Sequence, residues 1–125
     1  MSEYAQDSYA QLYPILSLLV DGHAYPDYIK ETASGKTVSP PYIIYREIGA
    51  VADNAGDEFL GAEYIRVQVD VYHKSHLDCR LLSNQVISAV LASIRHCEYV
   101  SRQRLYDPDT LLARYSMDFQ FLNNI

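Results

Sequence analysis

The sequence predicts an α+β fold in which two helices pack against a mostly antiparallel sheet of four to five strands, in the chain order α-β-β-α-β-β. Three observations indicate this class. An alternating segment leads directly into an amphipathic helix within residues 64–94, a second amphipathic segment lies near the N-terminus, and two pairs of strand-like segments flank connections with turn chemistry. An amphipathic strand and helix can bury their apolar faces against each other, so we expect the other elements to pack around residues 64–94.

The central strand and helix follow two different periods. Residues 64–73 (YIRVQVDVYH) alternate apolar and polar side chains, which is typical of a strand with one buried face. Ser75 is then a suitable helix N-cap, and Asp78 stands where a carboxylate favours a helix N-terminus. The inward strand residues are Ile65, Val67, Val69 and Val71, the outward ones are Arg66, Gln68 and Asp70, and the helix stripe comprises Cys79, Leu82, Val86, Ala89, Val90 and Ile94.

The N-terminal part is expected to be helical over residues 3–20 and to end at an Asp-Gly pair. Pro14 either starts the apolar part of this helix or kinks it, because proline lacks a backbone N–H and clashes with the preceding turn. Residues 23–29 (HAYPDYI) are expected to form an extended segment or an extra short strand near residues 25–29. The apolar stripe of the helix comprises Leu12, Ile15, Leu16, Leu19 and Val20.

The middle of the chain predicts a long hairpin. Residues 30–41 have loop chemistry and close with two prolines. Residues 42–50 and 62–73 are then predicted to be antiparallel strands. The connection over residues 51–63 is expected to be a loop, because it contains two glycines and four carboxylates.

The C-terminal part predicts a second hairpin. Residues 98–106 can form a strand, and the YDPD sequence that begins at Tyr106 has turn chemistry. Residues 113–121 then show the most regular alternation in the chain, which predicts a strand paired with the preceding one.

Composition limits the functional classes. A length of 125 residues indicates a single domain, residues 1–125, and 49% hydrophobic with 21% charged residues is typical of a globular protein. Proteins that bind nucleic acid through its phosphates need basic side chains, and this chain has a formal net charge of −6. Direct or sequence-specific binding of nucleic acid is therefore not expected. Twelve tyrosines without a tryptophan suit either the rim of a core or an interface.

The cysteines and the N-terminus suggest a reducing compartment. Cys79 and Cys97 lie on or just after one predicted helix and far apart along its axis, so a disulfide between them is not expected. The sequence shows no signal peptide and no apolar run of membrane-spanning length, so we expect a cytoplasmic protein without membrane contact.

The sequence contains few residues in patterns typical of a catalytic or metal-binding site. His73, His76 and Cys79 stand three residues apart, with His96 and Cys97 further on, but their predicted positions on a strand end and on different helix edges suit zinc poorly. Asp70 and Asp118 could act as paired acids, although aspartates on polar strand faces are ordinary. No nucleophile or phosphate-loop motif occurs, so we expect no enzyme, no catalytic residue, no metal and no cofactor.

The outward side of the second helix suggests protein contact. Opposite its apolar stripe, the helix carries Leu77, Leu81 and Leu91 beside Asn84 and Ser88. Scattered exposed leucines are common, but a contiguous set more often marks an interface. We therefore expect these five residues to form a subunit contact.

Several segments together resemble a known family. They are a first helix ending in LLVDG, an AYP segment, a loop closing in PPYIIY, and YIRVQVDVY followed by SHLDCRLLSNQVISAVLAS. Over roughly residues 12–122, the chain resembles the tail terminator, or tail completion, proteins of long-tailed bacteriophages and prophages, including the lambda-like tail terminator and a relative long annotated only as a domain of unknown function. The tyrosine-rich extreme N-terminus and Pro14 depart from that pattern.

The resemblance implies both a fold and a function. Such proteins have two helices on a mainly antiparallel sheet and form rings, usually hexamers, that cap the tail tube, stop its polymerisation and offer the head-joining surface. The implied partners are further copies of the chain, the major tail tube protein and a head connector or neck protein. The implied location is the host bacterial cytoplasm during assembly and then the virion tail.

The acidic connection is a candidate for a role in such a ring. The resemblance implies that this hairpin contributes to ring or tube contacts. A lumen lined by carboxylates would repel the DNA backbone and let it slide. The carboxylates either face the lumen or the tube end, or belong to a solvated loop; they are Asp53, Asp57, Glu58 and Glu63.

Two other functions are compatible with the sequence. A head–tail connector or neck protein of the same particle would also form a ring. A small α+β enzyme or ligand-binding module would use Asp70, Asp118 and the histidines, and it would require a polar pocket with shifted carboxylates.

Overall fold

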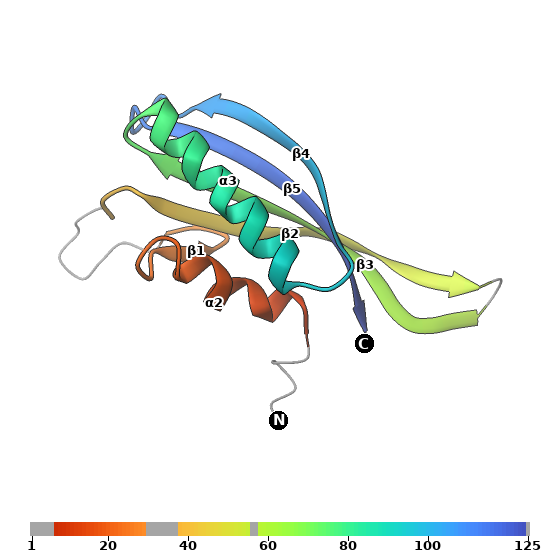
Figure 1. Ribbon diagram of the computed structural model, residues 1–125. Helices are drawn as coiled ribbons and strands as arrows, with labels where there is room; N and C mark the ends of the chain where they lie inside the picture. The colour runs from red at the N-terminus through yellow and green to blue at the C-terminus, as the bar shows by residue number, and fades with distance from the viewer. Residues whose placement is uncertain (1–6, 30–37, 56–57, 125) are drawn as a thin grey trace.

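The computed structural model describes residues 7–29, 38–55 and 58–124, and the side chains among them except those of residues 55–60 and 124. Within these residues, one five-stranded sheet carries the helices on a single face (Figure 1). The predicted α+β class is therefore confirmed. The elements are the 3-10 helix η1 (Tyr9–Gln11), α2 (Leu12–Ser17), β1 (Ala24–Pro26), β2 (Tyr42–Ala55), β3 (Glu58–His73), α3 (His76–Ser93), β4 (Cys97–Tyr106) and β5 (Ala113–Asn124).

The sheet is mixed, although most of it is antiparallel. Its strand order is β1-β2-β3-β5-β4, and every pair is antiparallel except β1 with β2. The predicted extra strand near residues 25–29 exists but is shorter and lies earlier, at Ala24–Pro26. Proline can end this strand because β1 is an edge strand.

The first helix is shorter than the predicted range 3–20. Within the described residues it consists of η1 and α2, and residues 3–6 lie outside them. Pro14 is the third residue of α2, where a backbone N–H has no acceptor within the helix, so the first turn accommodates it; the apolar stripe already begins at the buried Leu12. The segment ends at Gly22, whose φ is 85° and whose N–H donates to the carbonyl oxygen of Ser17 at 2.9 Å.

The hairpin over residues 42–73 is much longer than predicted. The expected connection 51–63 is mostly strand, and pairing continues out to Ala55 and Glu58. The register shifts at two places: an extra residue lies on β2 between Glu47 and Gly49, and extra residues lie on β3 opposite the step from Asp53 to Asn54. Pairing resumes after each shift, so the glycines and carboxylates do not end the strands. Because β5 pairs with β3 only as far as Ala62, residues 51–63 form a ribbon, here called the arm, whose outer end extends beyond the sheet (Figure 1).

The core lies between the helices and one face of the sheet, as predicted. The inward valines of β3 are fully buried, and they face the buried side of α3 together with Met117, Phe119 and Phe121 of β5. Fully burying one such side chain contributes about 1.5–3 kcal/mol. The predicted start of α3 is also confirmed, because the Ser75 hydroxyl oxygen accepts the Asp78 N–H at 3.1 Å.

Candidate assembly surfaces

The outward side of α3 carries a row of exposed side chains at helical spacing, here called the outer stripe: Leu77, Leu81, Asn84, Ser88 and Leu91. The leucines are exposed by 63%, 51% and 41% in chain order. On a helix that advances about 100° per residue, these positions lie opposite the buried residues Cys79, Val86 and Val90. The outer stripe therefore points away from the core of its own chain, and its role as a subunit interface remains a prediction.

Arg102 of β4 joins the sheet to α3, a contact that the sequence pattern did not predict. Its Nη1 donates to Asn84 Oδ1 at 2.6 Å and to Ser83 Oγ at 3.0 Å. Its guanidinium also lies over the ring of Tyr115, 5.5 Å from the centroid. One side of the outer stripe is consequently held in a fixed position relative to the sheet.

The carboxylates of the arm do not share one face. Asp53 pairs with Ala62, whereas Glu63 pairs with Ala52. Because opposed residues point to the same side and successive residues alternate, Asp53 and Glu63 point to opposite faces of the ribbon. Asp57 lies outside the described residues, and the side chain of Glu58 is not described.

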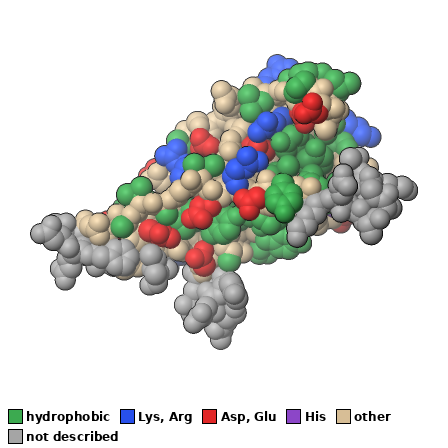
Figure 2. All heavy atoms as spheres, turned by 180° about the vertical axis from the view of Figure 1, so that it is seen from behind, with side chains coloured by type: hydrophobic (Ala, Val, Ile, Leu, Met, Phe, Trp, Pro, Cys, Tyr) green, Lys and Arg blue, Asp and Glu red, His purple; other side chains and the backbone are tan. Residues whose placement is uncertain are grey.

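The face of the sheet turned away from the helices, here called the open face, carries a shallow apolar groove near the arm. Ile48, Val51 and Tyr64 are exposed there by 55%, 70% and 41%, and Arg66 and Gln120 complete the groove. Figure 2 shows this face, with acidic side chains between the centre and the arm and basic side chains over the middle. Sequence reasoning missed the groove because the arm was expected to be a loop.

The middle of the open face holds a buried charge. Asp70 is fully buried, and its Oδ2 lies 2.6 Å from Arg114 Nη2 and 3.8 Å from Arg46 Nη2. Burial alone would lower the pKa of Arg114, but the hydrogen bond and the charge of Asp70 raise it above its ordinary value. Tyr42 and Tyr72 stack beside this group with ring centroids 4.7 Å apart, and burial raises the pKa of Tyr72 to about 12.

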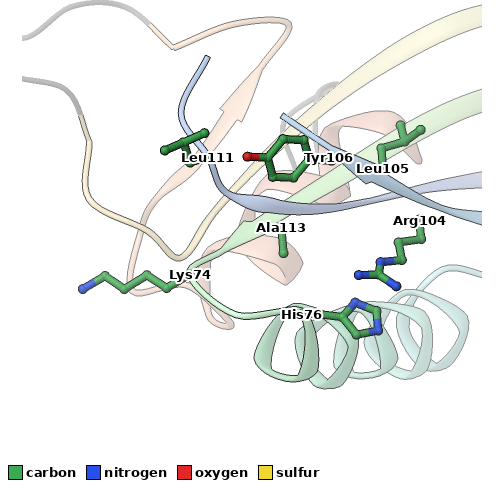
Figure 3. Close-up of a pocket in the computed structure, with 7 residues that line it drawn as sticks. All are labelled: Lys74, His76, Arg104, Leu105, Tyr106, Leu111 and Ala113. Carbon is green, nitrogen blue, oxygen red and sulfur yellow. The ribbon is translucent and has the colours of Figure 1, made fainter. Parts of the chain in front are cut away.

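A pocket at the opposite end of the sheet from the arm has basic side chains in its lining (Figure 3). We call it the basic pocket. Lys74 follows β3, His76 begins α3 and Arg104 lies on β4. Figure 3 shows the guanidinium of Arg104 directed toward His76, while Lys74 points outward at the rim. The His76 ring is held by stacking on Tyr115, with centroids 5.6 Å apart.

The remaining lining of the basic pocket is apolar. It consists of Leu105, Tyr106, Leu111 and Ala113. Leu111 is 69% exposed and has a φ of 61°, which is unfavourable for a bulky side chain. The turn that imposes this conformation is closed by Asp107, whose Oδ1 accepts the Asp109 N–H at 3.1 Å and whose Oδ2 accepts the Thr110 hydroxyl at 2.7 Å. The turn thus holds an apolar side chain at the mouth of a basic site.

Three of the candidate metal and catalytic residues, Cys79, Asp70 and Asp118, make contacts within the chain. Cys79 is buried in the core, its thiol lies 3.3 Å from the Val71 carbonyl oxygen, and burial raises its pKa to about 11. The described residues contain no cluster of His, Cys, Asp or Glu that could hold a metal ion. Asp70 is paired with arginine, and Asp118 lies opposite Gln68 at a different register position and accepts from the Ser101 hydroxyl at 3.5 Å.

Comparison with known proteins gives a family and several similar solved structures. A family model described as tail completion protein gp17 matches residues 14–123. A chain of the solved structure described as the virion of a native gene transfer agent (GTA) particle has a similar fold, with a TM-score of 0.68 at 12% identity, over 99% of this chain and 96% of that chain. A search of curated proteins found no match. None of the helices in the described part of the chain combines the length and hydropathy that crossing a bilayer requires.

Proposed function

The chain belongs to the family of tail completion protein gp17, and from this premise we propose that it forms a ring, which we expect to be a hexamer, at the end of a phage-type tail tube. Membership makes it a structural protein of a phage tail, in agreement with the resemblance seen in its sequence. The proposed finer role is to stop tube polymerisation and to offer the surface that joins the head. The observation that carries the proposal is the family match across residues 14–123.

The outer stripe supports self-association. Three leucines on one side of α3 are exposed by 41–63% in the described part of the chain, and Asn84 and Ser88 lie between the second and the third. Apolar side chains interspersed with small polar ones are typical of a protein interface. In a ring, each copy would bury this side of α3 against the next copy.

The charge of the chain supports a position around passing DNA. Several copies with a formal charge of −6 each would form a strongly acidic ring. Such a ring repels the phosphate backbone, so DNA can move through it without binding. We propose that the arm carboxylates Asp53 and Glu63 contribute to this field at the lumen or at the tube end.

The proposal is tested with particles assembled in the presence and absence of the protein. We expect tubes made without it to vary in length and to lack heads, and added protein to appear by electron microscopy as a ring at the tube end. Tails of normal length with heads attached, in its absence, would contradict the proposal. Binding to the head connector without binding to the tube would instead support the neck role.

A further inference from the structure

We propose that the basic pocket receives the acidic tip of the arm from a second copy of this chain. The inference rests on the self-association proposed above and names the two surfaces that meet. It depends on three observations: the charge of the pocket, the composition of the arm tip and the distance between them.

The basic pocket is positive on a chain that is acidic overall. Lys74, His76 and Arg104 contribute to its lining, and none of the described lining residues is a carboxylate. Asp107, which is next to the lining residue Tyr106, directs both carboxylate oxygens into its own turn. The N-terminus of α3 adds positive potential, because its first backbone N–H groups point out of the helix end at His76. Asp78 lies about 200° around the helix from His76, on its other side.

The arm tip matches this pocket in both charge and hydropathy. Its sequence runs Asp57, Glu58, Phe59, Leu60, so two carboxylates precede two large apolar residues. The pocket offers three basic side chains beside Leu105, Tyr106 and Leu111. Pairing of opposite charges around an apolar contact specifies the register of an interface and excludes other partners.

The geometry requires that the arm come from another copy. The tip includes Glu58, the first residue of β3, and Lys74 follows the last residue of that strand. At about 3.3 Å per residue, the 16 residues of β3 separate tip from pocket by about 50 Å of strand. A contact between opposite ends of neighbouring copies is heterologous, and such contacts generate a ring when the rotation between copies closes. Asp57 and Glu58 are then used between copies, while Asp53 and Glu63 remain further back on the arm.

The inference is tested by reversing charge on each surface. Arg104→Glu alters the pocket, and Asp57→Lys with Glu58→Lys alters the arm tip. We expect each change to weaken association at least tenfold in sedimentation at several concentrations and to make the remaining association less sensitive to salt. Joining both changes in one chain places a carboxylate in the pocket opposite the lysines of the tip, while Lys74 stays positive, so assembly is expected to recover in part. Arg95→Glu, and Glu47→Lys with Glu98→Lys, make the same charge changes at exposed positions elsewhere and are expected to assemble as the wild type does.

A second measurement covers assembly that occurs only on a tail. A carbodiimide joins a lysine amine to a carboxylate that touches it, so treated particles are expected to yield a crosslink between Lys74 of one copy and Asp57 or Glu58 of the next. Rings in which both variants assemble like their controls, or crosslinks between copies that omit Lys74, would overturn this inference and leave the proposed ring intact. Normal headed tails without the protein would overturn the proposed function itself.

Discussion

Asp70 and Arg114 form a charged hydrogen bond of 2.6 Å on the open face of the sheet, and the aspartate in this pair is fully buried. The two residues are 44 positions apart, and β3 and β5 bring them together. Arg46 of β2 approaches the same oxygen at 3.8 Å, so three adjacent strands share one buried charge. A buried carboxylate is tolerated only with such partners.

Removal of one partner is expected to destabilise the chain unequally. Arg114→Met leaves Asp70 with a single distant arginine, and we expect a loss of about 3–5 kcal/mol in the free energy of unfolding. Arg46→Met removes the weaker contact and is expected to cost less. Urea denaturation of both variants, with exposed Arg95→Met as the control, measures the difference. Equal effects of the two substitutions would show that Arg114 is not the main partner.

Alkaline pH is expected to destabilise the fold through buried tyrosines. Burial raises the pKa of Tyr45 and of Tyr72 from 10.0 to about 12. The folded state therefore holds these protons more tightly than the unfolded state, so stability is complete below about pH 10 and is lost as pH rises toward about 12. Tyrosinate absorbance and urea midpoints across this range test the expectation. Tyr72→Phe should flatten the pH dependence, and an unchanged slope would argue against it.

Substitutions at two adjacent residues of α3 are expected to distinguish the outer stripe from the buried side of the helix. Leu81→Asp places a charge at a position exposed by 51%, so we expect a folded chain with weakened ring formation. Leu82→Asp is the matched control, because Leu82 is 6% exposed and a buried unpaired charge should prevent folding. Circular dichroism reports folding, and light scattering reports assembly. Unfolding of the Leu81 variant would place that side chain in the core.

Neutralising the arm is expected to alter ring assembly or tail length. The change combines Asp53→Asn, Asp57→Asn, Glu58→Gln and Glu63→Gln. It removes four negative charges per copy, which reduces both the proposed contact between copies and the acidic field around DNA. Electron microscopy of tails and infectivity or transfer assays measure the result. Particles of normal length and full activity would leave the carboxylates with no role beyond solvation.

Local patterns predicted the central strand and helix well. The alternation in residues 64–73, the Ser75 cap and the stripe from Cys79 to Ile94 each depend on residues near one another in sequence. The exposed leucines of the outer stripe were predicted for the same reason. The arm was missed because glycines and carboxylates favour loops locally, whereas pairing between two strands kept residues 51–55 and 58–63 extended.

The sequence by itself determined the α+β class, the two faces of β3 and the two sides of α3, because period and capping are properties of adjacent residues. Only the tertiary structure decided which residues outside the apolar core become buried and which of them contact one another. It placed Arg114 on Asp70, Arg102 on Asn84, and Lys74, His76 and Arg104 around one pocket. Strand order and register determine these contacts. Both depend on pairing between segments that are many tens of residues apart, which no local pattern encodes.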